Sequence, residues 1–156
     1  MEQLIFAHIC QPVGAEFDTE ITVDAHGNPM ADGGVYATSR DLDRFGAPYL
    51  GGGVVPRVWI ADTARGASDG ADAFVAGDNP PDRPPGAHYR NCWWVRDPAA
   101  PFLTATGTYG QNVYVLPAAE LLIAKLSAWP PPLHQPTRLL TLDAVHAIAA
   151  ALREAG

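Results

Sequence analysis

Two long apolar segments joined by a short connection constrain the fold of this chain most strongly. Tyr109–Leu116 and Leu121–Trp129 both have the composition of strands, and Pro117–Glu120 between them has the length of a hairpin connection. Strands joined so closely pair antiparallel. A third strand-like segment, Tyr89–Val95, precedes them, and the almost continuous apolar character of Leu121–Trp129 is typical of a central strand covered on both faces. The sequence therefore predicts an antiparallel sheet with three C-terminal strands.

Segments with helical periodicity lie on both sides of these strands in the chain. Leu4–Ile9 has apolar residues at helical spacing, Thr38 is placed to cap a second helix, and a short third helix should begin at Pro56. Thr137 is placed to cap a final helix whose apolar residues fall on one face. Helices, then antiparallel strands, then a helix predict an α+β protein.

The length of the chain, 156 residues, predicts one domain. Residues 66–87 consist mainly of Gly, Ala, Asp and Pro, and they keep no helical or strand period. The segments on either side of them are too short to fold separately. We therefore expect residues 66–87 to be a long loop within a single domain that extends over residues 1–156.

Composition excludes several kinds of partner and site. Asp and Glu outnumber Lys and Arg by 17 to 10, and a net charge of −7 disfavours binding to nucleic acid or to an anionic membrane surface. No apolar run approaches the ~18 residues of a membrane span, and no signal-peptide pattern is visible. Cys10 and Cys92 lie among apolar residues and are interpreted as two buried free thiols, with a single disulfide left open. The spacing of Cys and His fits no metal site, so we expect neither a metal nor another cofactor.

The serine and lysine content makes a sharper exclusion. Lys125 is the single lysine, and the serines are Ser39, Ser68 and Ser127, so no Ser-x-x-Lys motif exists in the chain. Gly66–Gly70 matches the G-x-S-x-G pattern around Ser68, but no apolar strand precedes it and no helical period follows. This segment is therefore interpreted as a loop of small residues, and a Ser-His-Asp site assembled in space stays open.

Aromatic residues and glycines near the strands indicate a binding wall. Trp93 and Trp94 are adjacent in a strand, so their rings should point to opposite faces of the sheet, and only one of them can face any given pocket. Thr106–Gln111 contains glycines at the start of a strand, where small side chains let a ligand approach backbone N–H and C=O groups. A bulge or a plain strand start would also account for these glycines.

The order of the motifs resembles a known family more specifically than any single motif does. The likeness runs from about Leu4 to the final helix and is strongest in four segments: GGVYATSRDLDRFG (Gly33–Gly46), NCWWV (Asn91–Val95), GTYGQNVYVLP (Gly107–Pro117) and LLIAKLSAWP (Leu121–Pro130). These segments resemble the C-terminal part of serine β-lactamase-related hydrolases, most closely the 6-aminohexanoate-dimer hydrolase branch. The wider group includes class C β-lactamases, DD-peptidases and family VIII esterases.

The resemblance implies a partial β-lactamase/transpeptidase-like fold, because the family has an antiparallel sheet flanked by helices plus a helical lobe. The family nucleophile is the Ser of an S-x-x-K motif, activated by that Lys and by the Tyr of a Y-x-N-type motif. Both motifs precede the region that is similar here, so the chain would be the C-terminal part of a hydrolase without its nucleophile and base. We expect such a chain to be inactive alone, although its parent would hydrolyse small-molecule amides or esters through an acyl-enzyme.

The resemblance also assigns site residues. Ala105–Gly107 occupies the place of the family's K-T-G motif, with Ala instead of Lys, which argues against the carboxylate recognition of β-lactamases and suits the esterase and amidase branch. The backbone N–H of Thr108 would be one donor of the oxyanion hole. The substrate-binding residues implied are Asp32, Trp93 or Trp94, Thr106, Gly107 and Tyr109.

Three hypotheses follow from these observations. In the first, the chain is the C-terminal portion of a serine hydrolase and needs a missing N-terminal segment as its partner. In the second, it is a stand-alone ligand-binding pseudoenzyme module that uses the aromatic wall. In the third, it is a small hydrolase that uses Ser68 or Ser39 with a histidine.

Overall fold

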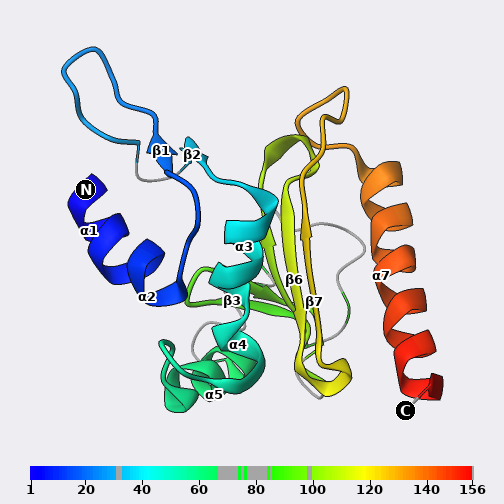
Figure 1. Cartoon of the computed structure of the whole chain (residues 1–156). Coiled ribbons are helices and arrows are strands. Elements are labelled where there is room, and N and C mark those ends of the chain that lie inside the picture. The colour runs from blue at the N-terminus through cyan, green and yellow to red at the C-terminus, as the bar shows by residue number, and fades with distance from the viewer. Residues whose placement is uncertain are drawn as a thin grey trace.

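A computed structural model describes residues 1–30, 33–66, 74, 76, 84, 86–97 and 100–155. Its centre is an antiparallel sheet with helices on both faces, so the predicted α+β class is confirmed (Figure 1). The strand order is β3-β4-β5-β6-β7. The strands are β3 (His88–Arg90), β4 (Trp93–Val95), β5 (Leu103–Thr106), β6 (Asn112–Leu116) and β7 (Leu121–Lys125).

The sheet has five strands where the sequence predicted three, for two physical reasons. Tyr89–Val95 is not one strand, because Asn91 and Cys92 have φ of 51° and 66° and turn the chain back between β3 and β4. A two-residue turn with both central φ angles positive matches the twist of a hairpin. The additional strand, β5, has only four residues, and it pairs with β4 on one side and β6 on the other.

The two predicted C-terminal strands are shorter than expected. β6 begins at Asn112 rather than Tyr109, because Tyr109 has a left-handed φ of 57° within the short 3₁₀ helix η2 (Thr108–Gly110). β7 ends at Lys125 rather than Trp129, and the 3₁₀ helix η3 (Pro117–Ala119) forms the predicted hairpin connection between β6 and β7. β7 lies at an edge of the described sheet, so the expectation of a central strand was wrong. Both of its faces are nevertheless covered, because Leu122 packs against the core on one face and Leu121 and Ile123 pack against the core on the other.

Three short helices cover one face of the sheet: α3 (Ser39–Gly46), α4 (Pro48–Gly51) and α5 (Arg57–Arg65). Thr38 caps α3 as predicted, because its hydroxyl accepts a hydrogen bond from the Asp41 N–H. Pro48 separates α3 from α4, as expected of a residue without an amide hydrogen. The core on this side joins buried residues of α4 and the strands: Tyr49, Trp93, Val95, Leu103, Val113 and Val115.

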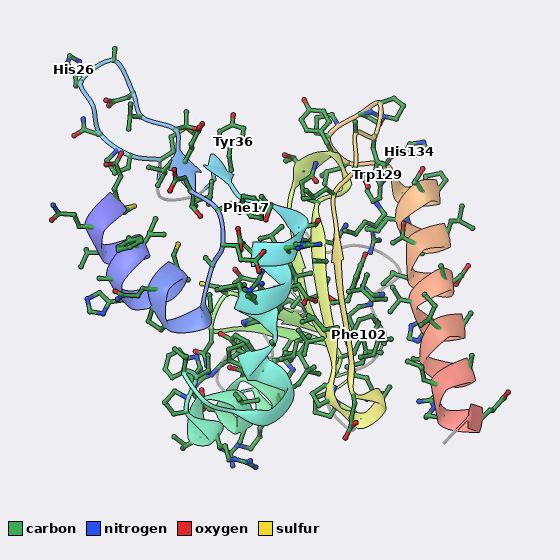
Figure 2. The ribbon with its side chains drawn as sticks, viewed as in Figure 1. Phe17, His26, Tyr36, Phe102, Trp129 and His134 are labelled. Carbon is green, nitrogen blue, oxygen red and sulfur yellow. The ribbon has the colours of Figure 1, made fainter. Side chains whose placement is uncertain are left out.

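The long helix α7 (Gln135–Ala155) covers the opposite face. Its buried residues pack on the sheet with Phe102, which lies between the sheet and α7 (Figure 2). The buried residues of this layer are Phe102, Tyr114, Leu116, Leu142, Val145 and Ala149. The helix begins two residues before the predicted cap, Thr137, whose hydroxyl is instead hydrogen-bonded to the His134 ring at 2.5 Å. Pro136 is accommodated in the first turn, where its missing N–H costs no intrahelical bond.

The N-terminal part forms a separate layer beyond α3 (Figure 1). A helical segment runs through α1 (Glu2–Ile5), the π-helix η1 (Phe6–Cys10) and α2 (Gln11–Val13), and it ends at the left-handed Gly14 as predicted. It is followed by a two-stranded pair, β1 (Glu20–Ile21) and β2 (Val35–Tyr36).

The cysteines do not follow their expected burial. Both are free, but Cys92 is exposed in the β3–β4 turn and Cys10 is half-buried, so the expectation of two buried thiols was wrong. The apolar neighbours of Cys92 in the sequence suggested that its thiol is buried. Cys92 instead has a positive φ and lies in the turn rather than in a strand. No helix in the described part of the chain is long and apolar enough to cross a membrane.

Candidate functional site at the β5–β6 turn

The turn between β5 and β6 presents an exposed stretch of backbone at one end of the sheet. Thr106, Gly107, Thr108 and Tyr109 are all exposed. Gly107 is extended, with φ −106° and ψ 171°, and η2 follows with Tyr109 and Gly110 at φ 57° and 84°. Two consecutive left-handed residues reverse the chain within a few residues, which leaves Gly107–Tyr109 beyond the paired strands, since Thr106 is the last residue of β5 and pairs with Asn112.

The segment after β7 holds this turn from behind. The Tyr109 N–H donates to the Pro132 carbonyl at 2.8 Å, and the Tyr109 carbonyl accepts from the Trp129 N–H at 3.1 Å. The side chain of Gln111 extends the pairing, because its amide donates to the Ser127 carbonyl at 2.6 Å and accepts from the Ser127 N–H at 3.0 Å. The turn is therefore fixed to residues 127–132 by four hydrogen bonds.

The amide of Thr108 differs from those around it. The Gly107 N–H donates to the Gln111 carbonyl at 2.8 Å, and the Tyr109 N–H is used as described above. Within the part of the chain that the structure describes, no hydrogen bond uses the Thr108 N–H. Because Thr108 is exposed and its N–H is unused, this N–H can donate a hydrogen bond to a ligand oxygen.

Lys125, at the end of β7, lies directly behind the turn. Its Nζ donates to the Gly110 carbonyl at 3.3 Å and to the Ser127 hydroxyl, and it lies 4.9 Å from the centre of the Trp129 ring. The same Gly110 carbonyl also accepts from the Asn112 side chain at 2.9 Å. Burial lowers the pKa of the Lys125 ammonium, because desolvation disfavours its charged form.

Trp129 covers Gly110 so closely that only glycine fits there. A Cβ at Gly110 would lie 2.3 Å from Cε2 of the Trp129 ring. Figure 2 shows Trp129 at the end of the sheet near the start of α7, close to His134. Sequence reasoning missed Lys125, Ser127 and Trp129 as neighbours of the site. The sequence contained a signal for this, because residues 125, 127 and 129 are spaced by two and would share one face of an extended segment. They also include the single lysine of a mostly apolar segment.

The tryptophan pair divides between the two faces, as the alternation predicted. Trp93 is 2% exposed and packs against Tyr49 with ring centroids 4.6 Å apart, so it belongs to the core under α4. Trp94 lies on the other face, half-buried, with its ring centroid 4.9 Å from that of the exposed Tyr89. Trp94 pairs with Thr104, two residues before Thr106, and its ring also contacts that of Phe74, with the centroids 5.8 Å apart.

The other candidate residues are placed as follows. Asp32 and Ser68 lie outside the described residues. Ser39 is the exposed first residue of α3, and Ser127 is half-buried against Lys125. No hydrogen bond joins a serine to a histidine within the described ranges, and those ranges contain no group of His, Cys, Asp and Glu side chains that could hold a metal ion.

Comparison with known proteins supports the resemblance expected from the motifs. No protein-family model matches the chain. The chain is 32% identical over 139 residues to the 6-aminohexanoate-dimer hydrolase of Paenarthrobacter ureafaciens. The match covers 83% of this chain but 34% of that hydrolase, so the chain spans about a third of the length of its curated relative.

The match extends over most of the chain, and its partial coverage of the relative is consistent with a C-terminal part of such an enzyme. The expected resemblance is thereby confirmed: the chain is similar over most of its length to the 6-aminohexanoate-dimer hydrolase, which is consistent with a C-terminal part of a β-lactamase-related hydrolase.

Proposed function

We propose that this chain forms one wall of the acyl-transfer site of a serine hydrolase that acts on amide or ester bonds. The observation that carries the proposal is the β5–β6 turn, where the unused Thr108 N–H is exposed in a chain similar to a hydrolase. In this role the Thr108 N–H donates to the oxygen on which negative charge develops as the tetrahedral intermediate forms. A preorganised donor of this kind contributes on the order of 10²–10³ to the rate in acyl-transfer enzymes.

The chemistry that breaks the bond must come from elsewhere. A serine nucleophile needs a base within hydrogen-bonding distance, and the chain has no Ser-x-x-Lys motif. We therefore propose that residues 1–156 are a single partial domain, inactive alone, whose partner is an N-terminal segment like that of its relative. That segment would supply the nucleophile, the base and the second oxyanion donor.

The substrate class follows from the relative and from the exposed wall. The relative is by name a hydrolase of the 6-aminohexanoate dimer, so we propose a small-molecule amide or ester as substrate. Thr106, Gly107 and Tyr109 would contact it from the turn, with Trp94 and Asp32 as further candidates. Ala105 in the place of a lysine favours a substrate without a carboxylate at that position.

The test is a hybrid enzyme in which this chain replaces the matched third of the Paenarthrobacter hydrolase. Thr108→Pro removes the proposed donor, and Gly107 already has the extended backbone that a residue before proline prefers. We expect Thr108→Pro to lower kcat for 6-aminohexanoate dimer roughly 100-fold. The matched variant Thr108→Ala keeps the N–H and should retain most of the activity.

Two outcomes would overturn this proposal. The first is a hybrid that folds but has no hydrolytic activity on amide or ester substrates. The second is a Thr108→Pro hybrid as active as the Thr108→Ala hybrid, which would remove the oxyanion role from this turn. Saturable binding of the dimer by the isolated chain, without turnover by the hybrid, would favour the alternative of a ligand-binding module, to which the exposed rings of Tyr89 and Tyr109 would contribute.

A further inference from the structure

We propose that Lys125 is a positioning residue, which fixes the β5–β6 turn and thereby the direction of the Thr108 N–H. This inference rests on the proposed function for its catalytic consequence, but the structural part can be tested without any turnover. Lys125 lies within LLIAKLSAWP, one of the segments that resemble the family, but the resemblance assigns it no role, and it lies two strands away from β5 in the sheet order.

The ammonium group joins three parts of the chain. Its Nζ bonds to the Gly110 carbonyl in the turn at 3.3 Å, to the Ser127 hydroxyl after β7, and it faces the Trp129 ring at 4.9 Å. An ammonium has three donors, and an aromatic face attracts a cation. One side chain therefore links the left-handed end of the turn to the segment that covers it.

The turn requires such a link because its backbone is strained. Tyr109 has a φ of 57° and is not glycine, and the next residue, Gly110, is also left-handed. A non-glycine residue persists in this region only when its surroundings hold it there. The Tyr109 hydrogen bonds to residues 129 and 132 hold one side, and the Lys125–Gly110 bond holds the other.

The same contacts argue against the competing role of Lys125 as a base for Ser127. The carbonyl of Gly110 and the face of Trp129 both favour the charged ammonium, which has no lone pair with which to accept a proton. A nucleophilic Ser127 would need the neutral amine directed at its hydroxyl. The Gly110 and Trp129 contacts therefore assign Lys125 to holding the turn.

The first experiment is hydrogen exchange by mass spectrometry on the full chain, because this method tolerates self-association. Lys125→Met keeps the length of the side chain but removes the charge and the donors. We expect residues 107–112 and 126–132 to exchange roughly tenfold faster in Lys125→Met, as expected for losing a hydrogen bond to a charged group. Residues 113–116 of β6 serve as the internal reference and should change less than about twofold.

Lys125→Arg is the matched control, since it keeps the charge and the donors, and it should restore most of the protection. Unchanged exchange of the turn in Lys125→Met would overturn the inference. Equal acceleration in β6 would do the same, because it would show a general stabilising role rather than a local one. If the Lys125→Met chain is too unfolded for comparison, Ser127→Ala takes its place. It removes one hydrogen-bond partner of Lys125 and should speed exchange in the same two segments, residues 107–112 and 126–132.

The second experiment uses the hybrid enzyme described above. We expect Lys125→Met to lower kcat roughly tenfold with KM changed less than about twofold, and Lys125→Arg to recover most of kcat. If Thr108→Pro lowers kcat but Lys125→Met leaves it unchanged, the inference about Lys125 is contradicted while the proposed function stands. An inactive unmodified hybrid would contradict the proposed function, while the exchange experiment would still decide whether Lys125 holds the turn.

Discussion

Single residues fix the local geometry at several points of the chain, and some of these contacts are easier to predict from the sequence than others. Thr38 and Asp41 stand in a capping pattern of three-residue spacing, so their contact could be predicted. Gly110 and Trp129 are 19 positions apart, and no local sequence pattern predicts that the Trp129 ring packs against the Gly110 backbone. The sequence therefore predicted the cap but not the packing behind the turn.

Gly110→Ala tests the packing behind the turn. Both Gly110 and Gly53 have positive φ, 84° and 108°, but a Cβ at Gly53 meets no atom within 4 Å, whereas at Gly110 it meets the Trp129 ring. We expect Gly110→Ala to cost about 1–3 kcal/mol more in the free energy of unfolding than Gly53→Ala, because overpacking adds to the backbone strain. Denaturant titration of both variants measures the difference, and equal costs would mean that Trp129 moves aside freely.

The Asp41 carboxylate connects the N-terminal layer to α3. It is 6% exposed and accepts hydrogen bonds from the Glu16 and Phe17 N–H groups at 2.8 and 3.2 Å and from the Thr38 hydroxyl at 2.9 Å. The Glu16 bond contributes most to holding the pKa of Asp41 below its usual value of 3.8. A folded pKa below the unfolded one means that the carboxylate stabilises the fold above about pH 4, and that this stabilisation is lost as the pH falls through the folded pKa.

Asp41→Asn should therefore lower the melting temperature at neutral pH. The difference from the unmodified chain should shrink as the pH falls below about 4, where the native carboxyl also becomes neutral. Asp43→Asn, on the exposed side of the same helix, is the control and should change the melting temperature little at any pH. If the melting temperature of Asp41→Asn stays below that of the unmodified chain by the same amount down to pH 2, the charge of Asp41 does not contribute to stability.

At the scale of elements, segments with a visible period or with turn residues were predicted, whereas β5 and the turn that separates β3 from β4 were not. The helices after Thr38 and Pro56, the final helix and the β6–β7 hairpin have periods or turn residues that the sequence displays. The β3–β4 turn lacks such a signal, because Asn91 is held by its side chain, which donates to Asp62 at 3.1 Å and to Thr63 at 2.9 Å. These partners on α5 are far away in the sequence, so the turn depends on tertiary contacts.

The docking of α7 on the sheet gives a prediction at this scale. Leu142 is 6% exposed against the sheet, while Leu140 on the same helix is 68% exposed. We expect Leu142→Ala to cost about 2–5 kcal/mol in the free energy of unfolding, because it leaves a cavity under the helix. Leu140→Ala should change it by less than about 0.5 kcal/mol. Urea titration of the two variants compares them, and similar values would mean that α7 does not pack as described.

At the scale of the whole molecule, the described chain leaves apolar side chains exposed and the outer edge of β7 unpaired. β7 is apolar except for Lys125, and it pairs on one side with β6, while its other side forms an edge of the sheet. Leu4 and Phe6 on the N-terminal helical segment are 62% and 63% exposed. An unpaired apolar edge and exposed apolar side chains both favour association.

We therefore predict that the isolated chain is oligomeric, loosely packed or poorly soluble. It should become more ordered when a homologous hydrolase segment that lacks the matched region is added in trans. Light scattering and a thermal melt measure both effects. A monodisperse monomer with a sharp, cooperative transition would contradict this prediction and would mean that the chain is a domain in its own right.

The central claim is that this chain supplies a wall of an acyl-transfer site but not the groups that break the bond. Turnover of 6-aminohexanoate dimer, p-nitrophenyl esters and nitrocefin tests it most directly, with the chain alone, a Paenarthrobacter hydrolase lacking the matched region alone, and both mixed. We expect no turnover by either part alone and hydrolysis of the dimer by the mixture. Turnover by the chain alone that Ser68→Ala abolishes would contradict the account, because the chain would then contain its own nucleophile.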